Sequence, residues 1–315
     1  MSELVDPAVV LFFTFLFGSM FRSATPILLA ALGETYVESG GVLNLGLEGI
    51  MLISAFTGFV GAVMTNSLVF GVLIGVLTGM LVGLIIALLV VTLQADQIVV
   101  GVGFSIAAIG LTSLAFRVLY GTSRLPTLPP KDTINIVPLS TIPIIGGIFN
   151  QPAMVYLGIL LIPIFYYVLF RTSLGLKIRT LGENPMVADT AGVNVFLYRY
   201  ALLLFGGAMA GLAGSYLSLY QVSVFQDNMT QGRGFVAIAI TMFARWNPAT
   251  VFLGSLLYGG AESLAGGIQA LGYLRTVPAE IVLMLPYIFT ILGLVALARR
   301  ARFPPALARP YKREL

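Results

Sequence analysis

Long apolar runs constrain the fold of this chain more than any other feature of its sequence. Several of them approach or exceed the ~20 consecutive apolar residues that an α-helix needs to cross a bilayer. Hydrophobic residues make up 58% of the 315 residues and charged residues only 10%, whereas a soluble domain carries about 25% charge. The sequence therefore predicts an all-α, polytopic membrane protein in which residues 1–315 form a single transmembrane domain.

Eight runs are predicted as ordinary membrane spans, and a ninth run is short. The eight cover residues 8–32, 43–64, 67–93, 98–119, 152–170, 197–220, 249–270 and 277–298. The short run, 233–244, is either a half-helix or the visible part of a tilted span. Arg22 interrupts the first run, and a charged residue at mid-bilayer costs about 2.5–3.5 kcal/mol on insertion scales. If residues 8–21 lie at the interface instead, the count falls and the N-terminus moves inside.

Lysine and arginine, which favour the cytoplasmic side, gather in two places. The tail 299–315 carries six, and the loop 171–195 carries three. Placing both in the cytoplasm requires an even number of crossings between them, so the short run must count as a crossing. About nine crossings (eight to ten) result, with the N-terminus and residues 120–151 outside. The Pro-rich segment 120–151 is predicted to be an external loop that either contacts an extracytoplasmic partner or simply connects two spans.

Several kinds of chemistry are excluded by what the sequence lacks. It contains no cysteine and no histidine, so disulfides, Cys/His metal sites and a His-dependent catalytic triad are ruled out. It has no GxxxxGK[ST] phosphate loop, so it does not bind ATP by that route. The net charge of +4 comes mostly from bases between apolar runs, which argues against nucleic-acid binding. We therefore expect no catalytic residue, metal or cofactor on this chain.

The polar loop 171–195 contains the signals of a very short helix. Asn184 is a good N-cap, Pro185 suits the first helical position, and Gly192 is placed to end the helix. The roughly seven residues between them make a rod only about 10 Å long. A membrane protein has little structural need for such a helix in a cytoplasmic loop, whereas a transport subunit driven by a separate soluble motor does need one. The loop therefore indicates a subunit that docks an ATPase.

Carboxylates inside apolar runs are functional candidates, because an intramembrane charge is costly. Gly40 and Gly41 break a helix before Asn44 and Glu48, which then stand one turn apart on one face. These two polar residues either line a solute path or hydrogen-bond the backbone that the break leaves exposed. Glu262 lies among small residues that allow close helix packing, and we expect it to bond within that contact rather than to touch a solute.

Two further polar groups stand at the edges of apolar runs. Gln97 opens the run 98–119, and Phe225, Asp227 and Asn228 precede the short run 233–244. Amides and carboxylates beside an aromatic ring suit a polar, ring-containing solute, although an exposed turn has the same composition. The substrate-pathway candidates are therefore Asn44, Glu48, Gln97, Phe225, Asp227, Asn228 and Glu262.

The chain also contains a weak internal sequence repeat. A run from Gly49 reaches Thr65 and then a Gly-rich helix, and a run from Gly234 reaches Trp246 and then another Gly-rich helix. In the predicted topology the first pair turns outside and the second turns inside, as inverted repeats do. One sequence does not separate such a repeat from chance.

Three segments carry a family resemblance. Residues 24–56 contain ALGE and GVLNLGLEG, residues 171–195 contain GENPMVADTAG, and residues 206–262 contain GRGFVAIAITMFARWNPATVFLG. Together they resemble the permease subunits of ABC importers in the branched-chain amino acid/ribose superfamily. The first segment is similar to nucleoside-type permeases that are served by basic-membrane-protein-type lipoproteins, and the chain resembles the shorter of the two paired permeases.

The resemblance implies a type II-like importer permease in a prokaryotic inner membrane. Its implied partners are a second, homologous permease, a cytoplasmic ATP-binding subunit, an extracytoplasmic substrate-binding lipoprotein and membrane lipid. The implied substrate is a nucleoside, with ribose-like sugars, branched-chain amino acids or a stand-alone secondary transporter as alternatives. ATP-driven closure would pass through the short helix 184–191. The residues implied to couple to the ATPase are Gly182, Glu183, Asn184, Pro185, Ala188, Ala191 and Gly192.

Overall fold

The computed structural model describes residues 7–121, 126–271, 279–298 and 303–311, and helices dominate them. In chain order these are α1 (Pro7–Ser39), α2 (Leu47–Thr65), α3 (Leu68–Ala87), α4 (Gln97–Tyr120), α5 (Ala153–Arg171), α6 (Ser173–Glu183), α7 (Pro185–Thr190), α8 (Val195–Tyr216), α9 (Arg233–Phe243), α10 (Pro248–Leu271) and α11 (Ala279–Ala298). Helices α3 and α8 continue into π-helical turns, Leu88–Thr92 and Leu217–Val222.

Seven helices within the described residues are long and apolar enough to cross a membrane: α1 to α5, α8 and α10. Helix α9 is shorter, with 11 residues, and the described part of α11 contains a shorter apolar stretch, Met284–Gly293. The prediction of an all-α, polytopic membrane protein is confirmed. The count of about nine crossings stays a prediction.

Helix α1 differs from its predicted boundaries. It runs unbroken through Arg22 and past residue 32 to Ser39. The Arg22 guanidinium donates a hydrogen bond to the Ser19 hydroxyl one turn earlier, so the helix does not have to end there. The extension brings Glu34 and Glu38, two acidic residues outside the predicted span, into the bundle.

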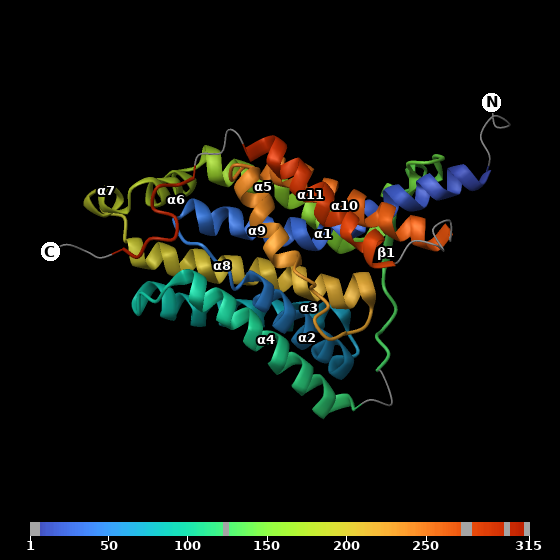
Figure 1. Cartoon of the computed structure of the whole chain (residues 1–315), viewed down its shortest axis with the longest axis horizontal. Helices are drawn as coiled ribbons and strands as arrows, with labels where there is room; N and C mark the ends of the chain where they lie inside the picture. Colours follow the sequence, from blue (N-terminus) through green and yellow to red (C-terminus); the bar gives the residue numbers. More distant parts are fainter. Residues whose placement is uncertain (1–6, 122–125, 272–278, 299–302, 312–315) are drawn as a thin grey trace.

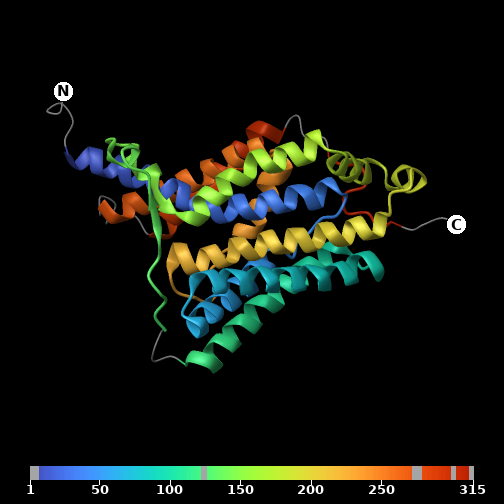
Figure 2. The ribbon, with the colours of Figure 1, turned by 180° about the vertical axis from the view of Figure 1, so that it is seen from behind.

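The helices lie roughly along one long axis, and the ends of the molecule differ (Figures 1 and 2). Helices α6 and α7 lie at one end, which we call the α7 end. The start of α1 lies at the opposite end, as does the segment between α4 and α5. That segment contains an antiparallel pair of short strands, β1 (Thr133–Asn135) and β2 (Asn150–Pro152), and two turns of 3-10 helix, Leu139–Thr141 and Gly146–Phe149.

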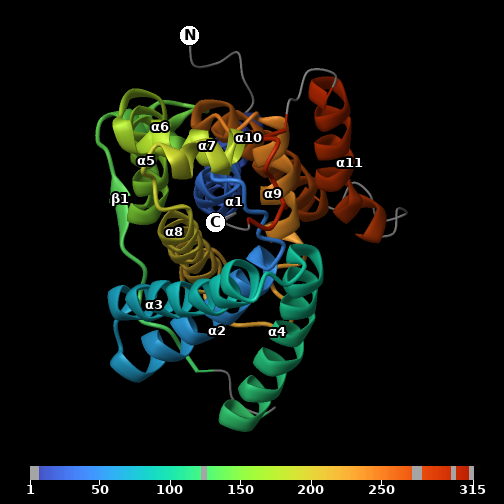
Figure 3. The ribbon, with the colours of Figure 1, turned by 90° about the vertical axis from the view of Figure 1, so that its left-hand side faces the viewer.

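The bundle is organised around α1 and α8, which pack against each other and against most other helices (Figure 3). Helix α8 packs on α3, and α1 packs on α10. Glycine makes the α3–α8 contact possible: a Cβ atom at Gly79 would lie 2.2 Å from the carbonyl oxygen of Gly207. Small residues at this crossing let the two backbones meet directly.

The two segments of the weak internal sequence repeat correspond to α2 and α9. Helices α2 and α9 both start inside the protein, each after a non-helical segment. Their N-termini are in contact: a Cβ atom at Gly234 would lie 2.6 Å from the Glu48 Cα. From this point α2 runs toward a turn at Asn66, near Leu128 in the segment between α4 and α5. Helix α9 runs the other way, toward a turn at Arg245 and Trp246. This is the arrangement that an inverted repeat predicts.

Candidate functional site

The short helix of the polar loop is α7. The side-chain oxygen of Asn184 accepts hydrogen bonds from the backbone amides of Met186 (3.1 Å) and Val187 (3.2 Å), and Pro185 occupies the first turn. Gly192, at φ +83°, follows the helix in the left-handed conformation that glycine adopts without strain. Asn184 therefore satisfies amides that a helix start leaves open, which lets six residues hold a helical shape.

The two sides of α7 are chemically different. Met186 and Val187 are 48% and 54% exposed, so two apolar side chains face outward from this helix. Ala188 is fully buried, packed with Leu181, Val195 and Tyr311. The sequence analysis named Ala188 and did not name Met186 or Val187, because which side of a six-residue helix faces the protein depends on these distant neighbours.

The remaining predicted coupling residues also divide by exposure. Glu183, Ala191 and Gly192 are exposed, whereas Gly182 is buried. A Cβ atom at Gly182 would lie 2.2 Å from the Ser39 carbonyl oxygen, so this glycine brings the end of α6 directly onto the end of α1. Gly182 and Ala188 hold the predicted coupling region to the protein, and the exposed residues face outward.

Glu48 joins the two helix starts at the centre of the bundle. One carboxylate oxygen accepts from the Gly232 amide at 2.8 Å and the other accepts from the Gly234 amide at 2.7 Å. The side chain is 3% exposed. A carboxylate at a helix N-terminus interacts favourably with its open amides and its dipole. Glu48 therefore stabilises the start of α9. It does not bond the non-helical segment that follows Gly41.

The non-helical segment between α1 and α2 is stabilised by other residues. The Gln97 side-chain oxygen accepts from the Leu43 amide at 2.8 Å, and a Glu34 oxygen accepts from the Asn44 amide at 3.0 Å. Gln97 is 5% exposed, so it serves the backbone within the protein. The side-chain amide of Asn44 is buried without a hydrogen-bond partner among the described residues.

Glu34 and Glu38, which are not among the predicted site residues, are both fully buried. A Glu38 oxygen accepts a hydrogen bond from the Trp246 indole at 2.6 Å, which ties α1 to the turn between α9 and α10. The available signal was the spacing of two acids four residues apart directly after an apolar run. It went unused because the first span was predicted to end at residue 32.

Glu262 pairs with a cation at the start of α9. Its carboxylate lies 2.5 Å from the Arg233 guanidinium, and both side chains are largely buried. Arg233 also donates to the Met229 carbonyl at 3.0 Å. The second Glu262 oxygen has no partner among the described residues, and Glu262 lines a cavity of about 290 Å³ with polar neighbours that include Ser19, Ser23 and Gln269.

The candidates before α9 lie apart from this centre. Phe225 is buried, with ring centroids 5.2–6.5 Å from those of Phe56, Phe59 and Phe116. Asp227 makes an exposed ion pair with Arg117 at 3.2 Å, and Asn228 has a positive φ of 52°. Phe225 therefore anchors the loop, and the two polar residues form its turn. Of the seven pathway candidates, Glu48 and Glu262 both contact the start of α9, whereas Asp227 pairs with Arg117 on α4.

Lys131, in the segment between α4 and α5, is partly withdrawn from water. The Lys131 ammonium donates to the Tyr220 carbonyl at 2.7 Å, which fixes the segment against the end of α8. Burial lowers the pKa of Lys131, and the nearby positive charge of Arg22 lowers it further.

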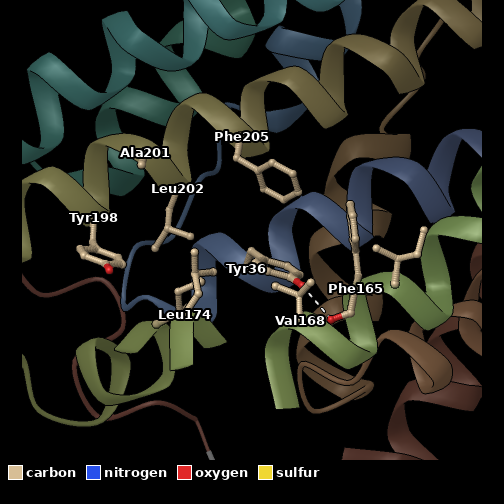
Figure 4. A pocket seen from close by; sticks show the side chains of 10 residues that line it. Tyr36, Phe165, Val168, Leu174, Tyr198, Ala201, Leu202 and Phe205 are labelled. Atoms are coloured by element: carbon tan, nitrogen blue, oxygen red, sulfur yellow. Dashed lines mark hydrogen bonds between the residues drawn. The ribbon is translucent and has the colours of Figure 1, made fainter. Parts of the chain in front are cut away.

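A cavity of about 340 Å³ lies between α1, α5, α6 and α8 (Figure 4). Its walls are apolar and aromatic, including Phe165, Leu202 and Phe205, and the Tyr36 hydroxyl is occupied by a hydrogen bond to the Phe165 carbonyl at 2.7 Å. These walls offer few groups that could replace the water around a polar solute. The cavity does not fit such a solute.

Comparisons with known proteins identify related permeases. The family described as "Branched-chain amino acid transport system / permease component" matches residues 16–294. Guanosine ABC transporter permease protein NupQ of Bacillus subtilis is 36% identical over 91% of this chain and 93% of its own length. Nucleoside ABC transporter permease protein NupC of Lactococcus lactis is 34% identical over 92% of this chain and 94% of its own.

Other relatives bear on substrate and partners. Putative glucose ABC transporter permease protein TsgC13 of Haloferax volcanii is 34% identical over 81% of this chain and 78% of its own length. The same Bacillus subtilis strain that holds NupQ has a second guanosine permease, NupP, which is 24% identical over 78% of this chain and 72% of its own length. No solved structure matches the chain.

Proposed function

The chain belongs to the family of permease components of branched-chain amino acid transport systems, and on this basis we propose that it forms half of the pathway of an ATP-driven nucleoside importer. It is a multi-pass protein of the cell membrane and a transport subunit rather than an enzyme. ATP hydrolysis is expected on a partner chain.

The coupling assignment rests mainly on α7. A capped helix of six residues that exposes Met186 and Val187 fits an apolar groove on a soluble partner, in the way that a short amphipathic helix fits any such groove. We assign this groove to the ATP-binding subunit, and the α7 end to the cytoplasm. The residues that hold or present the helix are Gly182, Glu183, Asn184, Pro185, Ala188, Ala191 and Gly192.

The other partners are a second permease and an extracytoplasmic binding lipoprotein. NupQ and NupP are both guanosine permeases of one strain, and both match this chain, which supports a pair of unlike subunits. The outer segment between α4 and α5, with its paired strands, is the surface that we assign to the lipoprotein.

For the solute path, we favour the polar groups near the start of α9. Glu262 keeps one oxygen without a partner among the described residues and lines a cavity that Ser19, Ser23 and Gln269 also line. The side-chain amide of Asn44 likewise has no partner among the described residues. Glu48 and Gln97 are occupied by backbone amides, so their role is to hold the path in shape. Asp227 and Asn228 would stand at its outer end, on the loop that Phe225 anchors.

Nucleosides are favoured because two of the most similar relatives are named for guanosine or nucleosides. A sugar is the second candidate, since a relative named for glucose has nearly the same identity. Both substrates fit a polar path, so the choice needs a direct measurement.

The test is uptake by the whole transporter in liposomes, with ATP inside and the binding lipoprotein outside. Labelled guanosine is offered with an excess of unlabelled nucleosides, glucose, ribose or branched-chain amino acids. We expect ATP-dependent guanosine uptake that only nucleosides suppress. Uptake of labelled glucose in place of guanosine would overturn the substrate, and uptake by this chain without ATPase would overturn the coupling.

A further inference from the structure

The C-terminal segment 303–311 crosses the α7 end of the molecule, and we propose that it transmits the movement of α7 to the membrane helices. We call residues 303–311 the C-terminal strap. The inference rests on the proposed coupling role of α7, and it adds a second route by which that coupling leaves the helix.

The strap is fixed to the coupling region by two contacts. The Ala306 amide donates to the Gly182 carbonyl at 2.9 Å, at the end of α6. The Tyr311 hydroxyl donates to the Asp189 carboxylate on α7 at 2.8 Å. Ala306 and Tyr311 are only 6% and 9% exposed, so the strap is packed into the protein here.

The same segment is fixed to three other parts of the molecule. Gln94, in the link between α3 and α4, donates to the Tyr311 carbonyl at 3.1 Å. Arg199 of α8 donates to the Arg309 carbonyl at 3.2 Å. The rings of Phe303 and Trp246 meet edge to face, with centroids 5.8 Å apart, at the turn between α9 and α10.

Tyr311 is the residue where these connections cross. Its hydroxyl is bonded to α7, its carbonyl is bonded to Gln94, and its ring lies 5.7 Å from that of Phe196 on α8. A displacement of Asp189 therefore acts on one residue that also contacts α8 and the α3–α4 link.

Chain connectivity alone does not provide these routes. Helix α7 is joined along the chain only to α6 and, through residues 191–194, to α8. Without the strap, movement of α7 would reach α5 and α8 first. With it, the α3–α4 link and the α9–α10 turn are contacted directly, and coupling between distant sites needs such a contiguous network or an equivalent two-state element.

Arg199 makes the attachment to α8 costly to undo. Its side chain is 3% exposed, and its Nε and Nη2 atoms have no hydrogen-bond partner among the described residues. The Arg309 carbonyl accepts the hydrogen bond from the Nη1 atom of Arg199, and removing a partner from a buried charge is strongly unfavourable. The strap is therefore a fixed part of the α7 end.

The test uses the complete transporter in liposomes and measures the solute imported per ATP hydrolysed. Tyr311→Phe removes the hydroxyl bond to Asp189 and keeps the ring. We expect transport per ATP to fall about two- to tenfold, the effect of losing one hydrogen bond, while the ATPase still co-purifies and hydrolyses ATP. Asp189→Asn keeps an acceptor oxygen and should retain coupling. Tyr167→Phe, at a 62% exposed position on α5, is the matched control and should behave as the unmodified chain.

The outcomes separate this proposal from the docking role of α7. Normal coupling in Tyr311→Phe overturns the strap and leaves docking in place. Loss of the ATPase from the purified Tyr311→Phe complex would also overturn it, since the strap would then serve attachment rather than transmission. If charged variants of Met186 and Val187 also transport normally, the docking role itself is wrong.

Discussion

At the scale of single residues, the buried acids do structural work for backbone amides that have no helix partner. Glu48 serves the start of α9, and Glu34 serves the break that follows α1. Both tasks arise because helices begin inside the protein, where water cannot satisfy their first amides. The sequence predicted that Glu48 either met a solute or bonded exposed backbone. It did not indicate that the backbone would belong to residues 232–234, because no local pattern connects positions so far apart.

We expect Glu48→Gln to lower the stability of the permease by about 1–3 kcal/mol, because its amide nitrogen would face one of two backbone N–H donors. Uptake should fall with it, since the start of α9 is no longer held. The measurement is thermal unfolding of the purified complex beside its initial uptake rate. Asp227→Asn is the control for the unfolding measurement alone, because an exposed ion pair contributes at most about 1 kcal/mol. Equal, mild effects of the two changes would show that Glu48 does not hold α9.

At the scale of elements, local sequence signals predicted the helix α7, because local interactions determine where it begins and ends. The N-cap, the proline and the glycine of the polar loop predicted a helix at 184–191, and α7 covers Pro185–Thr190. The buried side of α7 was not predictable, because Tyr311 and Leu181 decide it from outside the helix. The strap was missed for a similar reason: several of its bonds use backbone atoms of Ala306, Arg309 and Tyr311, which leave no mark on residue type.

A charge on the exposed side of α7 should uncouple transport. We expect Met186→Asp and Val187→Asp to lower transport per ATP about tenfold or more, because an unpaired charge in an apolar groove is costly. Asn184→Asp adds the same charge but keeps the cap, so it should lower transport per ATP less than the other two variants. The amount of protein in the membrane is measured in parallel. If the Asn184 variant is impaired as much as the other two, net charge and not the apolar contact determines docking.

At the scale of the whole molecule, alternating apolar runs and basic loops predicted the class of fold, because span length and charge bias are properties of the chain as a whole. The arrangement of the spans was not predictable in the same way. Helices α3 and α8 pack closely because glycines such as Gly79 and Gly207 permit backbone contact, and the sequence alone does not indicate which glycines contact each other. The predicted crossing count depends on α9, which is too short to cross alone.

Sidedness can be measured because the chain has no cysteine of its own. We expect a membrane-impermeant maleimide to label Thr141→Cys, in the outer segment, on intact cells. The same reagent should label Thr190→Cys, at the end of α7, only after the membrane is opened. Both positions are exposed in the structure, so access and not burial decides the result. Labelling of both from the same side would require a different number of crossings between them.

Helix α9 is held at both ends, so a movement at one end displaces the other. Eleven residues at ~1.5 Å each make a rod of about 16 Å, roughly half the thickness of a bilayer core of about 30 Å. One end is held by Glu48, and the turn at the other end is held by Glu38 and Phe303 through Trp246. For a rod of this length, a tilt of ~10° at one end shifts the other by ~3 Å, about the length of a hydrogen bond. Small rotations near Trp246 are thus large enough to break or remake the bonds at Glu48.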